Sequence, residues 1–308
     1  DKLVFGGQGF GRTEDGQPAF VWNALPGEDV ELNVLKKRKG VYEAVATEIT
    51  NPSPDRIEPK ESHWLSSSPW QHLSWEAELR WKKAIAAETY SKIGDLIIQS
   101  DELKIVTDDK QYGYRNKIEF SFIEKENGGV SLAFFARGQR HHIPADGSLL
   151  AEPVINDTAK KILAWVNEKK IPLRSLKTLI VRSDAKGHAI AALFIKDELS
   201  FDNYPALTDT LLGFHVYYST HRSPASVPTK KLYSAGQDYL IAELKNTKLK
   251  FGLLSFFQIN IPVFDLALND IAAFLHPKIP IVDYYSGVGA ISLPLSHNRE
   301  HAILVDNN

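Results

Sequence analysis

The feature that most constrains the fold is a pair of short apolar runs near the end of the chain, separated by two glycines. Ile279–Asp283 and Ala302–Asp306 each end in an aspartate, and Gly287 and Gly289 follow the first run. Short runs that are apolar throughout are typical of parallel strands covered on both faces. Strand, glycine turn, helix and strand is the opening unit of a doubly wound α/β sheet. Because one such unit does not make a sheet, we expect this domain to be incomplete within the chain.

The glycine turn and the aspartates predict a nucleoside site. Glycines let the backbone approach a ligand closely at a helix N-terminus, although a glycine pair can also form a tight turn that binds nothing. Asp306 ends the second strand, where a carboxylate can accept both ribose hydroxyl hydrogens. Ser292 stands where a dinucleotide fingerprint has its third glycine, and no basic residue is placed for a pyrophosphate. The pattern therefore favours an adenosyl cofactor such as S-adenosylmethionine over NAD.

Residues 1–50 are predicted to form a small β-rich module. Its short β-prone runs, separated by turn residues, are typical of an OB-type barrel; they are Leu3–Phe5, Ala19–Trp22, Val30–Leu35 and Val41–Thr47. The glycine-rich stretch 6–11 is expected to be a turn, and so is the basic run of Lys36, Lys37, Arg38 and Lys39. The basic run is either a solvated turn or a phosphate-contacting finger, and its sequence alone does not decide between them.

The middle of the chain is predicted to be an α+β domain that follows a linker. Residues 51–60 contain three prolines and are typical of a linker. A helix with Ser74 as its N-cap is expected next. Residues 103–250 then alternate strands and helices without a uniform βαβ rhythm, and a further helix over 262–276 leads to the C-terminal strands.

Two segments of this region carry candidate binding residues. In the strand that begins at Lys117, alternation places Arg115, Lys117 and Glu119 on one face. Cations flanked by aromatic residues suit a phosphate-and-base surface, but a half-buried structural strand has the same pattern. In Phe256–Asn260, Gln258 is a candidate hydrogen-bonding residue at the cofactor, although spacing alone favours a structural strand end.

Composition excludes several classes of site. The 308 residues contain no cysteine, so they cannot supply a disulfide, a thiolate zinc site, an iron–sulfur cluster or a cysteine nucleophile. The chain has 36 basic and 38 acidic side chains and a net charge of −2, so any nucleic-acid site must be a local patch. No apolar run approaches the ~18–20 residues of a membrane span. We expect a cytoplasmic protein without a membrane partner.

Taken together, the motifs resemble a known family. The matching segments occur in the family's order along nearly the whole chain: Lys2–Arg12, Phe20–Glu28, Trp70–His72, Tyr114–Lys117, Phe257–Asn260 and Asp283–Gly289. They resemble the TRAM-domain RNA uridine-C5 methyltransferases, which make 5-methyluridine in 23S ribosomal RNA or in tRNA. The resemblance implies a class I enzyme that uses S-adenosylmethionine and binds RNA, with 23S rRNA favoured over tRNA.

The resemblance also implies how the chain is divided. Residues 1–52 would form an OB-like TRAM RNA-binding domain, 53–95 a linker and helix, and 96–250 a central RNA-facing domain. Residues 251–308 would start a Rossmann-like methyltransferase domain. The cofactor residues would be Gln258, Tyr285, Gly287, Gly289 and Asp306. The RNA-binding residues would be Lys36, Lys37, Arg38, Lys39, Arg115 and Lys117.

Two departures from the family bear on activity. Many members carry an iron–sulfur cluster just before the helix at Gln71 and His72, but Glu61–Trp70 has serines there, so no cluster is expected. The family's nucleophilic cysteine and general-base glutamate are expected beyond Asn308, so we expect no catalytic residue and no methylation from this chain alone. The alternative is a non-catalytic RNA-binding or chaperone-like protein with a vestigial methyltransferase domain. Either is expected to be a monomer.

Overall fold

The computed structural model describes residues 1–308 except 127, 140, 224–225, 277, 298 and 308. The chain divides into two compact units. The first consists of Asp1–Ile105 and Phe134–Ala145, and the second of Val106–Ala133 and Asp146–Asn308. No helix in the part of the chain that the structure describes is long and apolar enough to cross a bilayer. The four-part division made from the sequence stays a prediction.

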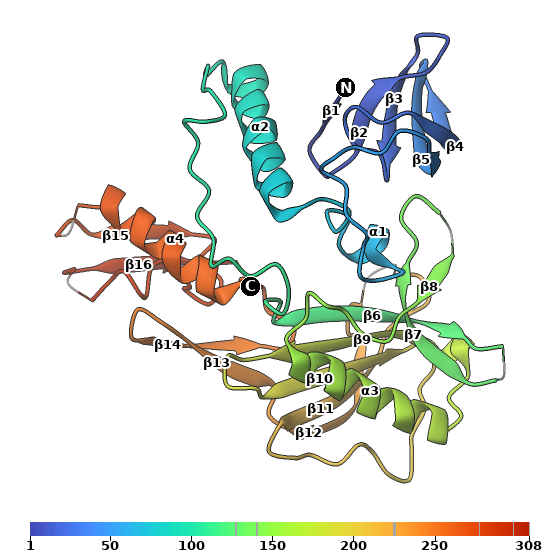
Figure 1. Cartoon of the computed structure of the whole chain (residues 1–308). Helices are drawn as coiled ribbons and strands as arrows, with labels where there is room; N and C mark the ends of the chain where they lie inside the picture. The colour runs from blue at the N-terminus through green and yellow to red at the C-terminus, as the bar shows by residue number, and fades with distance from the viewer. Residues whose placement is uncertain (127, 140, 224–225, 277, 298, 308) are drawn as a thin grey trace. The chain divides into compact units, whose positions relative to one another are not determined.

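The first unit begins with a five-stranded sheet, drawn in blue in Figure 1. Its strands are β1 (Lys2–Leu3), β2 (Gly9–Arg12), β3 (Pro18–Trp22), β4 (Val30–Arg38) and β5 (Val41–Ile49), in the order β1-β2-β3-β5-β4. β3 and β5 are parallel and the other pairs are antiparallel. One face, called the inner face here, carries the small core residues Ala19, Val21, Ala44 and Ala46. The opposite face is called the outer face.

The glycine-rich stretch is partly a strand, so its prediction as a turn was wrong for residues 9–11. Gly9 and Gly11 lie opposite Val21 and Ala19 in the β2–β3 ladder. A Cβ atom at Gly9 would lie 2.8 Å from the carbonyl oxygen of Ala24. Glycine is needed here because the backbone of the next segment approaches so closely, a use of strand glycines that turn statistics do not separate from turns.

The basic run was also predicted wrongly as a turn. Lys36, Lys37 and Arg38 are the last residues of β4, and β5 begins at Val41. Only Lys39 and Gly40 form the turn, with φ values of +50° and +79°. Two-residue hairpin turns with positive φ fit the twist of the flanking strands, which lets β4 continue through the charged residues.

Two helices complete the first unit, α1 (Trp64–Ser67) and α2 (Trp75–Gly94). The predicted N-cap of α2 is confirmed, because the Ser74 hydroxyl accepts a hydrogen bond from the Ala77 N–H at 3.3 Å. The proline-rich stretch 51–60 is tied to the sheet. Within it, Arg56 makes a bidentate ion pair with Glu28, with Nε–Oε1 and Nη2–Oε2 distances of 2.6 and 2.7 Å.

The second unit is built on a large sheet whose strands follow the order β12-β11-β10-β9-β6-β7. These strands are β6 (Lys117–Glu124), β7 (Val130–Phe135), β9 (Leu176–Ser183), β10 (Ala189–Ile195), β11 (Leu211–Tyr218) and β12 (Lys230–Gly236). The last two residues of β7 and the short strand β8 (His142–Pro144) belong to the first unit. The helix α3 (Pro153–Glu168) packs on β9 and β10, and the short 3₁₀ helix η1 (Leu173–Ser175) precedes β9 (Figure 1). The predicted α+β character of this region is confirmed.

The rest of the second unit is the hairpin β13 (Tyr239–Leu244) and β14 (Thr247–Gly252), the helix α4 (Ile261–Phe274) and the strands β15 (Ile281–Tyr284) and β16 (Ala302–Val305). β15 and β16 are parallel, as predicted. The helix predicted after Gly289 is absent, because residues 285–295 form successive turns. Pro294 has no N–H to donate to the carbonyl of Ala290, so a regular helix cannot continue there.

Candidate functional site

The ends of β15 and β16 bring the predicted glycine turn against the predicted acid. Tyr284 is paired with Val305, so the two strands end side by side. Immediately after the strands, the Gly287 N–H donates a hydrogen bond to Oδ2 of Asp306 at 2.8 Å. The Ser286 N–H donates to the Val305 carbonyl at 3.1 Å. The turn and the carboxylate therefore form one local structure at the carboxyl ends of two parallel strands, where open α/β sheets bind ligands.

Three residues give this turn its shape. Tyr285 has φ +64°, a left-handed conformation that is unusual for a bulky residue, and 88% of its surface is exposed. Gly289 has φ +75°, and a Cβ atom there would lie 2.5 Å from Cδ1 of Leu293. Gly287 also has a positive φ, but its missing Cβ faces open space. Bulky residues in the left-handed region are uncommon and occur more often at functional sites than elsewhere.

Gln258 lies on a different segment, the connection from β14 to α4. Its neighbour Phe257 is 2% exposed and belongs to the same apolar cluster as Val288 and Ala290 of the turn. Phe257 also stacks on Phe251 at 4.4 Å between ring centroids. The structure thus places Gln258 and the glycine turn around one core cluster.

Sequence reasoning missed the residue that holds this connection, Arg182 of β9. Its side chain is 1% exposed, and Nη1 donates to the carbonyl oxygens of Gly252 and Ser255 at 2.6 and 2.7 Å. Burial lowers the pKa of Arg182 to about 10. The only signal in the sequence is an arginine near the end of a largely apolar strand, Leu176–Ser183.

The predicted alternation in β6 is confirmed: Ile118 and Phe120 are buried, while Glu119 is exposed. Lys117 is half-buried and lies directly opposite Arg182 in the β6–β9 ladder. Burial lowers the pKa of Lys117, and the positive charge of Arg182 lowers it further. Lys117 is therefore partly accessible to solvent, and its positive charge lies close to that of Arg182.

Arg115 lies just before β6 and is held through its backbone. Its N–H donates to the carbonyl of Leu150 at 2.8 Å, and its carbonyl accepts from the Glu152 N–H at 3.0 Å. The side-chain Nε is buried and has no hydrogen-bond partner within the described residues. A buried donor of this kind is available to an acceptor that the protein does not provide.

The basic run of β4 divides between the two faces of its sheet. Lys36 and Arg38 lie on the outer face, opposite Glu43 and Val41. Lys37 lies on the inner face, where Nζ is 2.6 Å from the hydroxyl of Tyr42 and 4.4 Å from its ring centroid. The hydrogen bond to Tyr42 raises the pKa of Lys37. The four cations are therefore not one finger, because neighbours on a strand face opposite ways.

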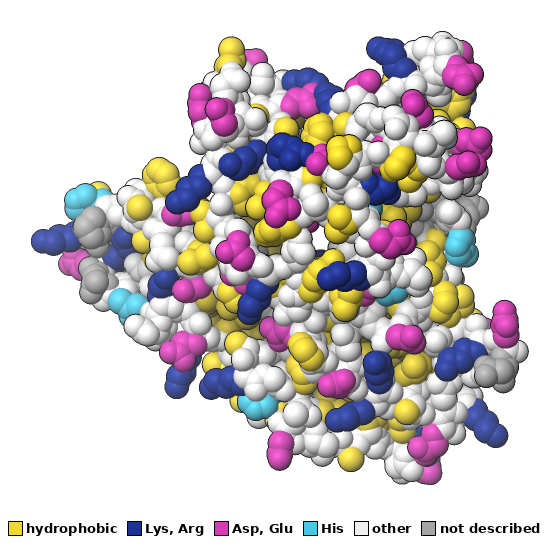
Figure 2. Space-filling view, viewed as in Figure 1, with side chains coloured by type: hydrophobic (Ala, Val, Ile, Leu, Met, Phe, Trp, Pro, Cys, Tyr) yellow, Lys and Arg dark blue, Asp and Glu magenta, His cyan; other side chains and the backbone are white. Residues whose placement is uncertain are grey.

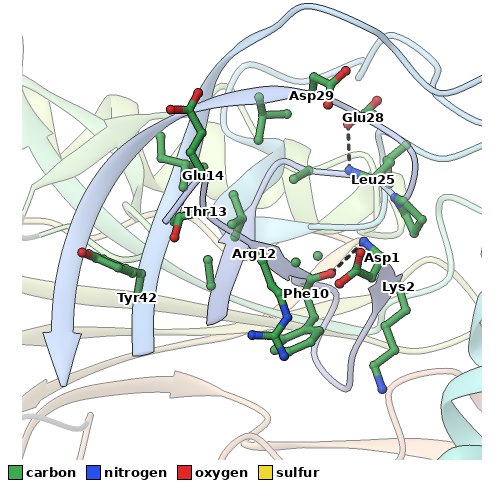
Figure 3. Close-up of a pocket in the computed structure, with 18 of the residues that line it drawn as sticks. Asp1, Lys2, Phe10, Arg12, Thr13, Glu14, Leu25, Glu28, Asp29 and Tyr42 are labelled. Atoms are coloured by element: carbon green, nitrogen blue, oxygen red, sulfur yellow. Dashed lines mark hydrogen bonds between the residues drawn. The ribbon is translucent and has the colours of Figure 1, made fainter. Parts of the chain in front are cut away.

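The inner face holds a pocket of about 670 Å³, shown in Figure 3. Small apolar side chains of β3 and β4 line it, together with the charged residues Asp1, Lys2, Arg12, Glu14, Asp15, Glu28 and Asp29. Acidic side chains outnumber the two basic ones, Lys2 and Arg12, and this balance disfavours phosphate. Figure 2 shows basic and acidic side chains interspersed over the face in view, in keeping with a net charge of −2.

The serine-rich segment before α2 is fixed by hydrogen bonds. Ser66 Oγ accepts from the Arg137 N–H at 2.9 Å, and Ser67 Oγ lies 2.9 Å from Nδ1 of His63. His72 is 1% exposed, and burial lowers its pKa to about 4. Among the described residues, no three histidine, aspartate or glutamate side chains are grouped to hold a metal. The chain contains no cysteine, and the role that the structure shows for Ser66 and Ser67 is to hydrogen-bond Arg137 and His63.

No family model matches the chain. Similar proteins nevertheless align with nearly all of it. An uncharacterised RNA methyltransferase of Caldanaerobacter subterraneus is 27% identical, with 96% of this chain and 70% of that protein aligned. The 23S rRNA (uracil(1939)-C(5))-methyltransferase RlmD of Halomonas elongata is 26% identical over 96% of this chain and 62% of its own length. Over nearly its whole length, the chain is thus similar to proteins named as RNA methyltransferases.

One solved structure has the same fold as this chain. The tRNA (uracil-54, C5)-methyltransferase of Pyrococcus abyssi, solved in complex with S-adenosyl-L-homocysteine, superposes with a TM-score of 0.72 at 18% identity. The superposition covers 98% of this chain and 73% of that protein. The mixed α/β architecture with several sheets therefore matches the fold of that solved structure.

Proposed function

We propose that the protein is an RNA methyltransferase that transfers a methyl group from S-adenosylmethionine to C5 of a uridine, with 23S rRNA favoured over tRNA. The observation that carries the proposal is the turn in which Gly287 is bonded to Asp306 at the carboxyl ends of β15 and β16. The relatives named as RNA methyltransferases, including one named for a uracil of 23S rRNA, support it.

The residues at this turn fit an adenosyl group. Asp306 carries a carboxylate, a group that can accept hydrogen bonds from ribose hydroxyls. The missing Cβ of Gly287 leaves open space for a ligand beside the backbone. Tyr285 has an exposed ring that can contact the adenosyl group. Gln258 has a side-chain amide that can hydrogen-bond to it, and its neighbour Phe257 packs in the same apolar cluster as the turn. We assign Gln258, Tyr285, Gly287, Gly289 and Asp306 to hold the cofactor, which supplies the electrophilic methyl group.

The chemistry places a further requirement on the enzyme. Uracil C5 is a weak nucleophile until a thiolate adds to C6, and a base must later remove the C5 proton. The 308 residues contain no cysteine. We therefore propose that a segment outside them supplies the thiolate and the base, and that these residues alone do not methylate RNA.

Features of both units support the proposed domains. The order β1-β2-β3-β5-β4, with β3 parallel to β5, supports an OB-like TRAM domain at residues 1–52. In β15 and β16, Val282, Ile303 and Val305 are 50%, 53% and 42% exposed. Apolar strands of this kind are normally covered on both faces, which supports a methyltransferase sheet with further strands.

RNA is the proposed partner. The outer-face residues Lys36 and Arg38 and the half-buried Lys117 are cations that can reach phosphates, and Lys37, Lys39 and Arg115 extend the proposed set. A monomeric state, a cytoplasmic location and the absence of a membrane partner stay predictions from the sequence.

Transfer of a labelled methyl group from S-adenosylmethionine to unmodified 23S rRNA and tRNA tests the proposal. The chain should be assayed beside the protein encoded by its complete gene, and the RNA digested to nucleosides. We expect 5-methyluridine from the complete protein, mainly in 23S rRNA. The lack of any thiol favours RNA binding alone as the second candidate function, and a complete protein that binds RNA but makes no methylated nucleoside would establish it.

A further inference from the structure

The outer face of the first unit carries an aromatic pair beside cations. Phe10 of β2 and Phe20 of β3 are register partners, with ring centroids 5.2 Å apart. Phe20 is also the partner of Glu43 on β5, and Glu43 is the partner of Lys36 on β4. Register partners in neighbouring strands lie on the same face with Cβ atoms about 5 Å apart. Phe20, Glu43 and Lys36 therefore form a row across three strands of the outer face.

A pocket lies over this row. It has a volume of about 400 Å³, and its lining includes Gln8, Phe20, Lys36, Arg38, Val41 and Glu43. This volume lies within the range of sites that bind small molecules or single nucleotides. The residues come from β3, β4, β5 and the β1–β2 connection. OB folds bind oligonucleotides through one face of the barrel and loops that include the one between strands 1 and 2, and Gln8 comes from the corresponding connection of the proposed OB-like domain.

The chemistry of the pocket specifies an unpaired base. The half-buried ring of Phe20 lines the pocket and offers a stacking surface to any base, and Lys36 and Arg38 can contact the flanking phosphates. Glu43 would repel phosphate, so in an RNA site it must face N–H donors instead. Single-stranded RNA is read through such contacts to base edges. Guanine is the base that presents two adjacent donors, N1–H and N2–H, to the two oxygens of one carboxylate.

Gln8 adds a second polar group to the pocket. Its Nε2 is buried and has no hydrogen-bond partner among the described residues. A buried amide donor without a partner destabilises the fold unless a ligand or a water molecule accepts its hydrogen bond. O6 of guanine is an acceptor next to N1–H, so a guanine can offer an acceptor to Gln8 and donors to Glu43, which line the same pocket.

We propose that the outer face binds one unpaired guanine of an RNA strand. The base stacks on Phe20, its N1–H and N2–H donate to Glu43, and the neighbouring phosphates contact Lys36 and Arg38. The proposal rests on the proposed RNA substrate and adds a base preference to it.

The test compares equilibrium binding of oligouridines that carry one central guanosine, adenosine, cytidine or no replacement. The whole chain is used, with Phe20→Leu, Glu43→Gln and a control, Glu48→Gln, which makes the same charge change on the same strand. We expect wild-type protein to prefer the guanosine oligomer by about 5-fold to 150-fold, the factor that a bidentate base contact supplies. Glu43→Gln should remove the preference without weakening oligouridine binding, and Glu48→Gln should keep it.

Phe20→Leu should weaken binding of every oligomer by about 5-fold to 150-fold, the loss in affinity expected when one base–aromatic stack is removed. The dependence of binding on salt concentration should stay the same, because no phosphate contact is lost. Thermal melting of each variant establishes that the sheet is intact. If wild-type protein binds all four oligomers equally and both variants bind as the wild type does, the guanine site is wrong and RNA binding stands. If wild-type protein binds none of them, both the guanine site and the proposed RNA substrate are wrong.

Discussion

The side-chain amide of Asn116 donates a hydrogen bond to the main-chain carbonyl of Gln258 at 2.9 Å, across 142 positions of sequence. Asn116 is fully buried, and its own N–H donates to the carbonyl of Ile259 at 3.1 Å. Its carbonyl accepts from the Ser183 N–H at 2.9 Å. One residue directly before β6 thus fixes the backbone that carries the candidate cofactor residue Gln258.

Replacing Asn116 should loosen the connection between β14 and α4. Asn116→Ala leaves the carbonyl of Gln258 without its partner, at a cost of about 1–3 kcal/mol in the free energy of unfolding. We expect amide hydrogen exchange to accelerate in residues 256–260 before it does elsewhere in the second unit. The matched control is Asn269→Ala on the exposed surface of α4. Equal protection in both variants would contradict the role of Asn116.

Removing the charge of Arg182 should change the titration of Lys117. Arg182→Met takes away the cation that, after burial, lowers the pKa of Lys117, so that pKa should rise towards its ordinary value. The variant also leaves the carbonyls of Gly252 and Ser255 unpaired, which should reduce stability. NMR titration of the Lys117 side chain measures the first effect. Arg174→Met, on η1, is the control that should leave the titration unchanged.

The burial of His72 should make the first unit less stable in acid. Its pKa is about 4 in the folded protein against 6.5 when unfolded, so between these values the unfolded chain takes up a proton that the folded chain does not. The stabilisation is complete above pH 6.5 and is lost as the pH falls towards 4, by about 3 kcal/mol. Denaturant titrations across this range should show the loss in wild-type protein.

The control for that prediction separates His72 from other histidines. His72→Phe keeps a ring against Trp64 and should flatten the pH dependence, whereas the exposed His141→Gln should leave it as it is. A pH profile that His72→Phe does not alter would show that other groups cause the acid sensitivity.

The ion pair between Arg56 and Glu28 should be worth far more than the exposed pairs of α2. The Glu28 side chain has no exposed surface, and the Arg56 side chain is 15% exposed. Burial alone would raise the pKa of Glu28, but Arg56 and two backbone N–H groups hold it below its usual value. Arg56→Met leaves the carboxylate unpaired and should cost about 3–5 kcal/mol.

A double-mutant cycle with Glu28→Gln measures the coupling between the two side chains. The same cycle on Lys82 and Glu78, an exposed pair within α2, should give a coupling close to zero. Similar couplings for the two pairs would mean that burial adds nothing to the Arg56–Glu28 interaction.

Local patterns predicted the elements that depend on local physics. The apolar runs of β15 and β16, the alternation in β6 and the cap at Ser74 depend on residues near in sequence, and the structure contains all three. The glycine turn and Asp306 also meet as the strand pattern indicated. These features follow from the periodicities of strands and from capping.

Long-range contacts explain what the sequence did not predict. Arg182 binds carbonyls some 70 positions away, and nothing near it in sequence marks that role. Gly9 of β2 is required by the approach of Ala24, and the basic run extends β4 because the turn needs only Lys39 and Gly40. In each case tertiary packing decided between local structures that the sequence permits equally.

The salt dependence of RNA binding tests the central claim most directly. Lys36, Lys37, Arg38 and Lys39 are replaced together by alanine, and the control replaces Arg80, Lys82, Lys83 and Lys92 of α2, which changes the net charge equally. Binding of single-stranded RNA is measured over a series of salt concentrations. We predict that the slope of log K against log salt becomes shallower by about 0.7 for each phosphate that the first variant no longer binds, and is unchanged in the control. An unchanged slope in both variants would contradict the assignment of this strand to RNA.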